Sequence, residues 1–469
     1  MPIFTVGAAG TTSSTAFDIA GSAMFHSNSL ASRTPSSAGN RRTYTISQWA
    51  KKSSLATSNN VIFCAGESTN DQLNIFFRDT IIVQDETSNV ANFTLATNAV
   101  FRDTSAWYHV VLAVDTTQST ASDRVKLYVN GQQITSFSTE DYPTQNVETN
   151  VNRTINHSIA GRGYQSAQYF DGYLSECILV DGQQLTPTSF GEFDTNSGIW
   201  KPIDPSGITF GTNGHYYNFA TKATDPVDAS GNGLNMSSSN VLTTDYAKDT
   251  PLNNYCVLNI LTSRGGGTIE EGNLKYTASG SDSSIFGTLG IPPGMKVYFE
   301  VKLVNNTAQN AIGIHNQYDP GGTFVKGGNG TGTYSYKVRG AASVTQYFNN
   351  GSSTNTSISN YANDTIIGVA VDNENGQIHY SANGTYINSS DPTDNNPAAL
   401  VTGFDTSKEQ YLHFSLDTTT SQPINEYNFG SPLYSISSGN SDANGHGNFE
   451  YAVPNGYYAL NTKNLAEFG

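Results

Sequence analysis

Short runs of alternating apolar and polar residues, separated by turn-forming residues, constrain the fold of this chain more than any other feature. Thr43 to Ala50 (TYTISQWA) and Ala106 to Asp115 (AWYHVVLAVD) are two such runs, and Asn130-Gly131 follows a third at Asp123 to Val129. Alternation with a period of two places successive side chains on opposite faces of a strand. Asn-Gly accepts the positive φ angles of a tight hairpin turn. The pattern therefore predicts antiparallel β-structure.

The runs fall into two groups along the chain. The first group ends with Phe170 to Val180 (FDGYLSECILV), and the second extends from Lys296 to Val304 (KVYFEVKLV) to Gln410 to Leu416 (QYLHFSL). Between about residues 186 and 250 the alternation thins and proline and glycine punctuate the chain. We predict an all-β protein with less than about a tenth of its residues helical. It comprises an N-terminal arm (1–19), a β-sandwich (20–185), a Pro/Gly-rich connecting segment packed on that sandwich (186–250) and a second antiparallel, jelly-roll-like β-sandwich (251–469).

Composition excludes several classes of partner. The chain has 26 Tyr and 23 Phe, enough aromatic residues to fill real cores, although only 13% of its residues are charged. The net charge of -16 divides evenly, with -8 in residues 1–250 and -8 in residues 251–469. An even acidic charge opposes binding to nucleic acid or to an anionic membrane surface. No run of about 18 apolar residues occurs, so membrane insertion is not expected.

The cysteines and the N-terminus bear on the cellular compartment. Cys64, Cys177 and Cys256 are too few and too far apart in the sequence for a disulfide scaffold or a zinc site. We therefore expect all three to be buried and reduced. The first twenty residues lack the basic start and continuous apolar core of a secretory signal peptide.

Three segments of the first half carry a resemblance to a known family. They are Trp107 to Val111 (WYHVV), Val125 to Gly131 (VKLYVNG) and Phe170 to Glu176 (FDGYLSE). In this order they resemble the W-H-H-V, L-Y-V-N-G and F-x-G-x-I-D-E strands of the laminin-G or concanavalin A-like lectin superfamily. The resemblance covers about residues 20 to 185 and implies a lectin-like sandwich. Ser175 stands where the last motif usually has an acidic residue. The chain therefore departs from the family at the position of a metal ligand.

The second half is similar to a different family. Asp364 to Asp372 (DTIIGVAVD), followed by Ile378 to Gly384 (IHYSANG), resembles the D-x-I-G-x-x-x-D strand and K-N-G turn of the SPRY (B30.2-like) sandwich. Ala382 stands where that family commonly has lysine.

The whole arrangement resembles structural proteins of tailed phages of aquatic bacteria. The segments that carry this resemblance are SRTPSSAGNRRTYTISQWAKK, LTPTSFGEFDTNSGIWKP and PNGYYALNTKNL. It implies a homo-oligomeric virion protein, bound to other virion proteins on the external surface of the particle and released by lysis without a signal peptide. Its expected function is host attachment as an appendage or fibre that recognises surface polysaccharide. The alternative is a capsid or tail decoration or connector protein that binds only other virion proteins.

Catalysis is not expected from the motifs. Glycoside hydrolases need two carboxylates that face one sugar bond, and the Glu-x-Asp-x-Glu strand of the glycosidases in this superfamily is absent. Glu192-Phe193-Asp194 is the nearest fragment, and it lies in the Pro-rich segment, where a capped turn is the simpler interpretation.

Calcium is the one cofactor that the sequence leaves open. Asp228, Ser230 and Asn232 form the most calcium-like loop, since hard cations prefer oxygen ligands. The same residues fit a tight turn, in which Asp and Asn make local hydrogen bonds. The turn is the favoured interpretation, and no cofactor is expected.

Candidate ligand-binding residues come from the second sandwich. Tyr334, Tyr336 and Tyr347 lie in or after a glycine-rich insertion, 321–340, that reads as an exposed loop or hairpin. Exposed aromatic rings with polar neighbours are what sugar binding needs, and packing against a neighbouring protein is the alternative. On this interpretation, Tyr336→Ala weakens attachment and leaves the fold intact.

Overall fold

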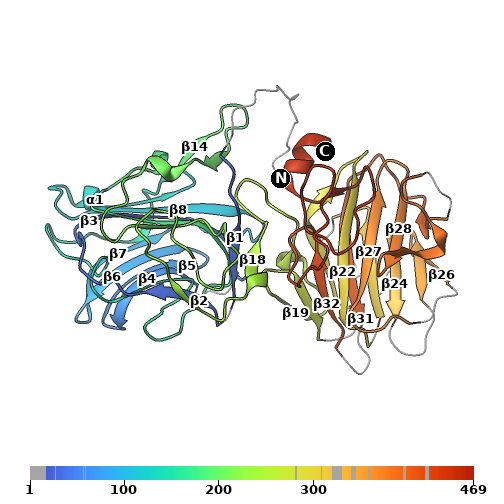
Figure 1. Ribbon diagram of the computed structural model, residues 1–469, viewed down its shortest axis with the longest axis horizontal. Coiled ribbons are helices and arrows are strands. Elements are labelled where there is room, and N and C mark those ends of the chain that lie inside the picture. The colour runs from blue at the N-terminus through green and yellow to red at the C-terminus, as the bar shows by residue number, and fades with distance from the viewer. Residues whose placement is uncertain are drawn as a thin grey trace. The chain divides into compact units, whose positions relative to one another are not determined.

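The computed structural model describes residues 17–26, 28–55, 58, 60–279, 283–307, 309–318, 330–339, 345–356, 360–394, 398–417 and 422–469. Two compact units divide this chain, one within Ser13–Leu252 and the other within Asn253–Gly469. Each unit contains two large antiparallel sheets (Figure 1). The fold is therefore all-β with two antiparallel sandwiches, as predicted from the alternation.

Two eight-stranded sheets, A and B, form the first unit. Sheet A has the order β10 (Gln132–Gln133), β9 (Val125–Val129), β8 (Trp107–Asp115), β3 (Thr43–Lys52), β13 (Gly172–Asp181), β1 (Ser22–Phe25) and β18 (Tyr246–Ala247), with β16 (His215–Tyr217) also paired to β13. Sheet B has the order β11 (Phe137–Asp141), β7 (Val90–Thr97), β6 (Ile81–Thr87), β5 (Asp71–Phe77), β4 (Val61–Ser68), β12 (Asn156–Ile159), β2 (Leu30–Arg33) and β17 (Ser237–Ser239).

Alternate residues of these strands fill the core between the sheets. Tyr44 and Ile46 of β3 and Leu73 and Ile75 of β5 all belong to one buried cluster. The hairpin turn expected at Asn130-Gly131 is present, with φ angles of 48° and 77°. Short helical pieces are α1 (Ala121–Arg124) and the 3-10 turns Pro187–Ser189, Pro205–Gly207 and Thr243–Asp245.

Residues 186–250 contribute a cover over the outer face of sheet A. The hairpin of β14 (Gly191–Phe193) and β15 (Trp200–Pro202) lies here, and the Nε1 of Trp200 donates to the Nδ1 of His109 at 3.0 Å. Phe210 and Tyr216 pack with side chains of β8, β9 and β13 in a second buried cluster. Burial lowers the pKa of His109 to about 3, so this imidazole is neutral.

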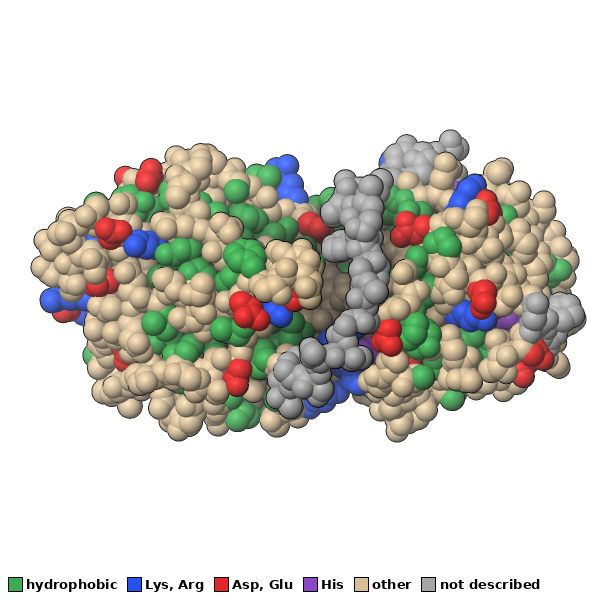
Figure 2. All heavy atoms as spheres, turned by 90° about the horizontal axis from the view of Figure 1, so that it is seen from above, with side chains coloured by type: hydrophobic (Ala, Val, Ile, Leu, Met, Phe, Trp, Pro, Cys, Tyr) green, Lys and Arg blue, Asp and Glu red, His purple; other side chains and the backbone are tan. Residues whose placement is uncertain are grey.

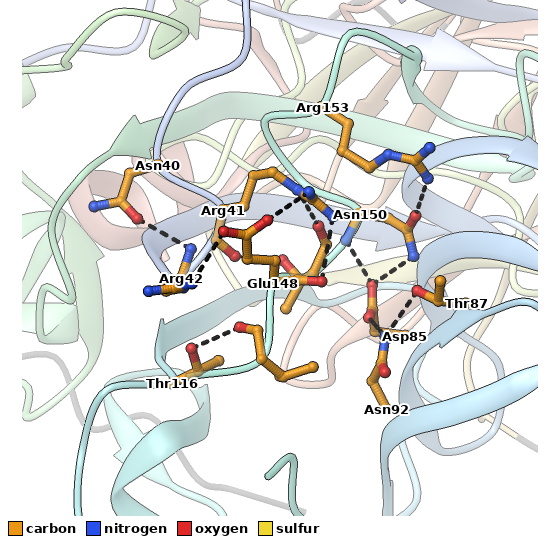
Figure 3. Close-up of polar contacts among 12 residues, drawn as sticks. Asn40, Arg41, Arg42, Asp85, Thr87, Asn92, Thr116, Glu148, Asn150 and Arg153 are labelled. Atoms are coloured by element: carbon orange, nitrogen blue, oxygen red, sulfur yellow. Dashed lines mark hydrogen bonds and ion pairs between the residues drawn. The ribbon is translucent and has the colours of Figure 1, made fainter. Parts of the chain in front are cut away.

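A polar network anchors the connection from β11 to β12 (Figure 3). Asp85, which is buried, accepts hydrogen bonds from the backbone N–H and the side-chain amide of Asn150 at 3.0 and 3.1 Å, and from Asn92 at 2.6 Å. Arg41 pairs with Glu148 at 2.8 Å. Burial raises the pKa of Asp85 to about 6. These side-chain contacts hold the loop in place, because the hydrogen bonds of a sheet do not extend over it.

The second unit also has two main sheets. The larger has the order β19 (Gly267–Glu270), β20 (Lys275–Ala278), β32 (Ile424–Asn428), β22 (Lys296–Asn305), β27 (Thr365–Asp372), β28 (Gln377–Ala382) and β29 (Thr385–Tyr386), with β30 (Val401–Thr402) on β28 and β33 (Tyr458–Ala459) on β22. The smaller has the order β21 (Ser283–Ile291), β31 (Gln410–Asp417), β23 (Gln309–His315), β24 (Thr333–Arg339), β25 (Gln346–Asn349) and β26 (Ser352–Asn355).

Helical structure is equally sparse in this unit, with α2 (Thr462–Phe468) and the 3-10 turns Ile260–Thr262 and Ile387–Ser389. The glycine-rich insertion expected as an exposed loop is described only from residue 330 to 339, and residues 321–329 and 340 lie outside the described residues. The described part is mainly β24, which pairs with β23 and β25 inside the six-stranded sheet. The segment was expected to be an exposed loop or hairpin. The antiparallel pairing of β24 with β23 fits the hairpin, whereas the expected exposure was wrong, because Tyr334 and Tyr336 are buried.

Cys64, Cys177 and Cys256 are buried, and none of the three is in a disulfide bond. Their lasting reduction in solution stays a prediction. Within the described ranges, no helix is long and apolar enough to cross a membrane.

Candidate functional site

A hollow of about 550 Å³ opens on the second unit, where strands β21, β31 and β23 lie side by side. Three chain segments form it: the irregular part of β21, the residues after β23 and the residues at the start of β31. Its lining consists of Gly287, Thr288, Gly290, Asn316, Gln317, Tyr318, Lys408, Glu409 and Tyr411.

Two tyrosine rings form one wall of the hollow. The ring centroids of Tyr318 and Tyr411 are 5.3 Å apart and the planes are inclined by 48°. Tyr318 is 39% exposed, and its ring rests against Phe286 at 5.5 Å. The side-chain amide of Asn259 donates to the Tyr318 hydroxyl at 2.8 Å. An exposed ring held from behind and at its hydroxyl is a rigid aromatic surface.

Charged groups lie beside the rings. The Tyr411 hydroxyl donates to Glu409 at 2.6 Å. Burial, followed by this hydrogen bond and the charge of Glu409, raises the pKa of Tyr411 to about 12. Lys408, an exposed side chain, pairs with Asp405 at 3.2 Å. The hollow thus offers a hydrogen-bond donor and an acceptor next to an apolar surface.

Gly290 makes room for Glu409. A Cβ at position 290 would lie 2.1 Å from a carboxylate oxygen of Glu409, so any side chain there displaces the carboxylate. The strand β21 is irregular at this point, since its pairing with β31 shifts register between Phe286 and Gly290. A bulge of this kind commonly re-aims side chains next to a binding site.

Among the lining residues that the structure describes, Glu409 is the one with a carboxylate. Retaining and inverting glycosidases both need two carboxylates. The described lining residues offer hydrogen bonding, ion pairing and aromatic stacking.

The three tyrosines expected to be exposed are placed differently. Tyr334 and Tyr336 lie in β24, and their side chains are buried in the core of the second unit. The Tyr336 hydroxyl bonds to Thr345 and Tyr361, both at 3.0 Å. Tyr347 lies in β25 and is half-buried against the same core. The assumed exposure was wrong for Tyr334 and Tyr336, because alternate side chains of a paired strand face the opposing sheet.

Asp228, Ser230 and Asn232 form a hydrogen-bonded turn. Asp228 accepts from the backbone N–H groups of Tyr216 and Leu234 and from both the N–H and the hydroxyl of Ser230, all at 2.8 to 2.9 Å. Asn232 donates to two backbone carbonyls at 2.8 Å. Although burial raises it, these hydrogen bonds hold the pKa of Asp228 below its ordinary value. Within the described ranges, no cluster of three His, Cys, Asp or Glu side chains could hold a metal ion.

The residues quoted as nearest to a catalytic or family motif have structural contacts. Asp194 accepts from Ser197 and Lys201 within the turn between β14 and β15, which is the capped turn expected there. Ser175 is buried and donates to the carbonyl of Gly21 at 2.9 Å.

Comparison with known proteins identifies both halves. Residues 26–188 match the model of the concanavalin A-like lectin/glucanases superfamily, and residues 296–414 match that of the SPRY domain. The protein therefore carries a concanavalin A-like domain followed by a SPRY domain. These are families of generally non-catalytic binding domains. A search of curated proteins gave no match.

Several solved structures match parts of the chain at low identity. The SPRY domain of human HERC1 is 14% identical, and the match covers 36% of this chain and 96% of that chain at a TM-score of 0.28. A putative carbohydrate binding protein from Bacteroides ovatus is 16% identical, with 47% of this chain and 58% of that chain covered at a TM-score of 0.34. The LG1-3 region of the laminin alpha2 chain is 8% identical, with 87% and 60% covered at a TM-score of 0.34.

Sequence reasoning missed Tyr318 and Tyr411. A signal for Tyr411 was present, because in QYLHFSL the residues Leu412 and Phe414 face the core and the period of two turns Tyr411 to the other face. Nothing local signals that Tyr318 meets it, since this contact depends on which strands are neighbours.

Proposed function

We propose that the protein is a non-catalytic carbohydrate-binding protein and that the hollow of the second unit binds a sugar unit. The paired rings of Tyr318 and Tyr411 carry this proposal. The CH-rich face of a sugar stacks on such a ring, while its hydroxyl groups exchange hydrogen bonds with polar neighbours. Lys408 donates and Glu409 accepts at the same wall.

Two general features of the protein fit a carbohydrate ligand. On the face shown in Figure 2, the Lys, Arg, Asp and Glu side chains lie scattered among other side chains and the backbone. The first unit matches a lectin superfamily, which fits a carbohydrate ligand for the protein as a whole.

The proposal is tested with the full chain on a glycan array, followed by calorimetric titration with the glycans retained. A stacked ring is worth about 0.5 to 1.5 kcal/mol, so Tyr318→Ala and Tyr411→Ala should each weaken affinity about two- to tenfold. Tyr451→Ala is the matched control, because Tyr451 is half-buried in the same unit and lies outside the hollow. No glycan retained, or equal losses in all three variants, contradicts the proposal.

We further propose that this binding serves host attachment by an external component of a phage particle, in contact with other virion proteins and with copies of itself. The sequence resemblance to tailed-phage structural proteins supports it. Mass spectrometry of purified particles should detect the chain, and an antibody against it should label intact particles and block adsorption. Binding only to other virion proteins, with no effect on adsorption, would favour a decoration or connector protein.

A further inference from the structure

One charged group of the hollow in the second unit, the carboxylate of Glu409, lacks a counter-charge. It forms no ion pair with a basic side chain in the part of the chain that the structure describes, and its neighbour Lys408 pairs with Asp405 at 3.2 Å. The charges of Lys408 and Asp405 offset each other, so the hollow keeps the negative charge of Glu409. The Glu409 side chain is exposed, and a ligand in the hollow can therefore reach it.

Tyr411 fixes the position of this carboxylate. Its hydroxyl donates to Oε2 of Glu409 at 2.6 Å. Burial raises the pKa of Tyr411 to about 12, so the hydroxyl keeps its proton at neutral pH and remains a donor. The hydrogen bond occupies one lone pair of Oε2 and leaves Oε1 to accept from a ligand.

The neighbouring strand provides the space in which Oε1 lies. Gly290 of β21 is paired with Tyr411 of β31. A Cβ at position 290 would lie 2.1 Å from Oε1 of Glu409, and its three nearest atoms would all belong to the Glu409 side chain. The bare backbone of Gly290 therefore lets the carboxylate lie at this point of the hollow.

The two tyrosine rings favour a positively charged group at the same wall. The ring centroids of Tyr318 and Tyr411 are 5.3 Å apart, and Tyr318 is 39% exposed. The face of an aromatic ring carries partial negative charge and attracts a cation that lies within about 6 Å of its centroid. A carboxylate beside the rings adds a charge–charge attraction that a neutral hydroxyl group of a ligand does not gain.

An anionic group is disfavoured in the hollow. Asp405 accepts from the backbone N–H and the hydroxyl of Ser407 at 3.1 and 2.6 Å, so it is held in place beside Lys408. An anion would have to displace Asp405 from Lys408, and it would then lie near the like charge of Glu409. The charges of the hollow thus select for a cation.

We propose that the hollow selects sugars that carry a free amino group, such as glucosamine, over neutral and N-acetylated sugars. This inference rests on the proposed function of the hollow and adds the class of its ligand. The CH-rich face of the amino sugar stacks on Tyr318. Its ammonium group donates to Oε1 of Glu409 and lies against the ring of Tyr411.

The experiment titrates the full chain with tetramers of glucosamine, of N-acetylglucosamine and of glucose that share one glycosidic linkage. They differ in a single substituent of each unit, which is an ammonium, an acetamido or a hydroxyl group. Calorimetry should show that the glucosamine tetramer binds at least about tenfold more tightly than either of the others, because only its substituent is charged. This preference should shrink as salt rises, because salt screens the charge.

Two variants test the carboxylate in different ways. Glu409→Gln removes the charge and should remove the preference. Gly290→Ala keeps every charge and displaces the carboxylate, so it should reduce the preference. Alanine fits the backbone there, because Gly290 lies outside the left-handed region.

Glu374→Gln is the matched control. Glu374 is an exposed glutamate of the same unit that lies outside the hollow and pairs with Lys296. Its replacement lowers the net acidic charge by the same amount as Glu409→Gln. It should leave the preference for the glucosamine tetramer unchanged, because the preference depends on a local contact.

The outcomes separate this proposal from the proposed function. Equal affinity for the three tetramers, all weakened by Tyr318→Ala, overturns the preference for an amino group and leaves sugar binding in the hollow in place. Absence of binding by the glucosamine tetramer overturns the present proposal, whatever a glycan array retains. A preference that is unchanged in Glu409→Gln or in Gly290→Ala also overturns it.

Tetralysine tests the class of the ligand. It carries amino groups without a sugar ring, and a chain of net charge -16 attracts polycations at long range. It should bind more weakly than the glucosamine tetramer, and Tyr318→Ala should not change its affinity. Tighter binding of tetralysine that is lost in Tyr318→Ala would identify a basic peptide as the ligand and overturn the proposal.

Discussion

Removal of Asp249 should destabilise the first unit strongly, because it leaves a buried ammonium group without its nearest counter-charge. Lys51 and Asp249 form an ion pair of 2.7 Å, and each side chain is only 1% exposed. Breaking such a pair from one side typically costs about 3 to 5 kcal/mol. For a unit of this size, Asp249→Ala should therefore lower the melting temperature by about 6 to 20 °C.

The double variant Lys51→Met/Asp249→Leu separates the buried charge from the loss of packing. Apolar replacement of both partners removes the charge and is often close to neutral. Trp107 donates from Nε1 to Asp249 at 2.8 Å, so its buried N–H then lacks a partner, at a cost of about 1 to 3 kcal/mol. The double variant should thus be less stable than the native protein and more stable than Asp249→Ala.

Urea unfolding of the full chain, followed by tryptophan fluorescence, measures these differences. All three tryptophans, Trp49, Trp107 and Trp200, lie in the first unit, so the signal reports on that unit. Asp123→Ala is the control, because its pair with Lys126 is half exposed and should matter by less than about 1 kcal/mol. The reasoning fails if Asp249→Ala costs no more than this control, or if the double variant is no more stable than Asp249→Ala.

Substitutions at two further residues, Tyr336 and Glu176, test buried groups. Tyr336→Ala should lower the free energy of unfolding of the second unit by about 3 to 5 kcal/mol, because it leaves a cavity in the core. Tyr336→Phe should lower it by about 1 kcal/mol, because it removes a hydrogen bond. Thermal unfolding measures both, and a native-like melting temperature for Tyr336→Ala would contradict the burial of Tyr336. Burial raises the pKa of Glu176 to about 8, so the stability that this group contributes is complete below about pH 4.5 and is lost as pH rises through 8. The free energy of unfolding of Glu176→Gln, taken relative to that of the native chain, should therefore rise by on the order of 3 to 5 kcal/mol between about pH 4.5 and 8. If the urea midpoints of the two proteins instead change with pH in the same way across this range, the reasoning is refuted.

Strand positions could be predicted because alternation is a local property of the chain. The run read at Ala106 to Asp115 is β8, Trp107–Asp115, and that read at Lys296 to Val304 is β22, Lys296–Asn305. In both strands the residues that pack into the core are those that the period of two groups together. No knowledge of the neighbouring strands is needed for that conclusion.

The location of Tyr334 and Tyr336 could also have been read from alternation, and composition misled the interpretation. In TYSYKVR, residues 333–339, the apolar positions Tyr334, Tyr336 and Val338 repeat with a period of two, as in any half-buried strand. The glycines on both sides suggested a loop. Glycine content describes the flanks of a segment, whereas the period describes the segment itself, and here the period was the better guide.

The hollow of the second unit depends on strand order, which no single segment encodes. It joins residues 287–290, 316–318 and 408–411 only because β31 lies between β21 and β23 in the sheet. A motif search cannot find such a site, because its residues are far apart in sequence and of ordinary types. Alternation can still nominate part of the site, since Tyr411 is an aromatic residue on an outward position of a strand that the pattern identifies. The remaining residues follow only when the pairing order of the strands is known.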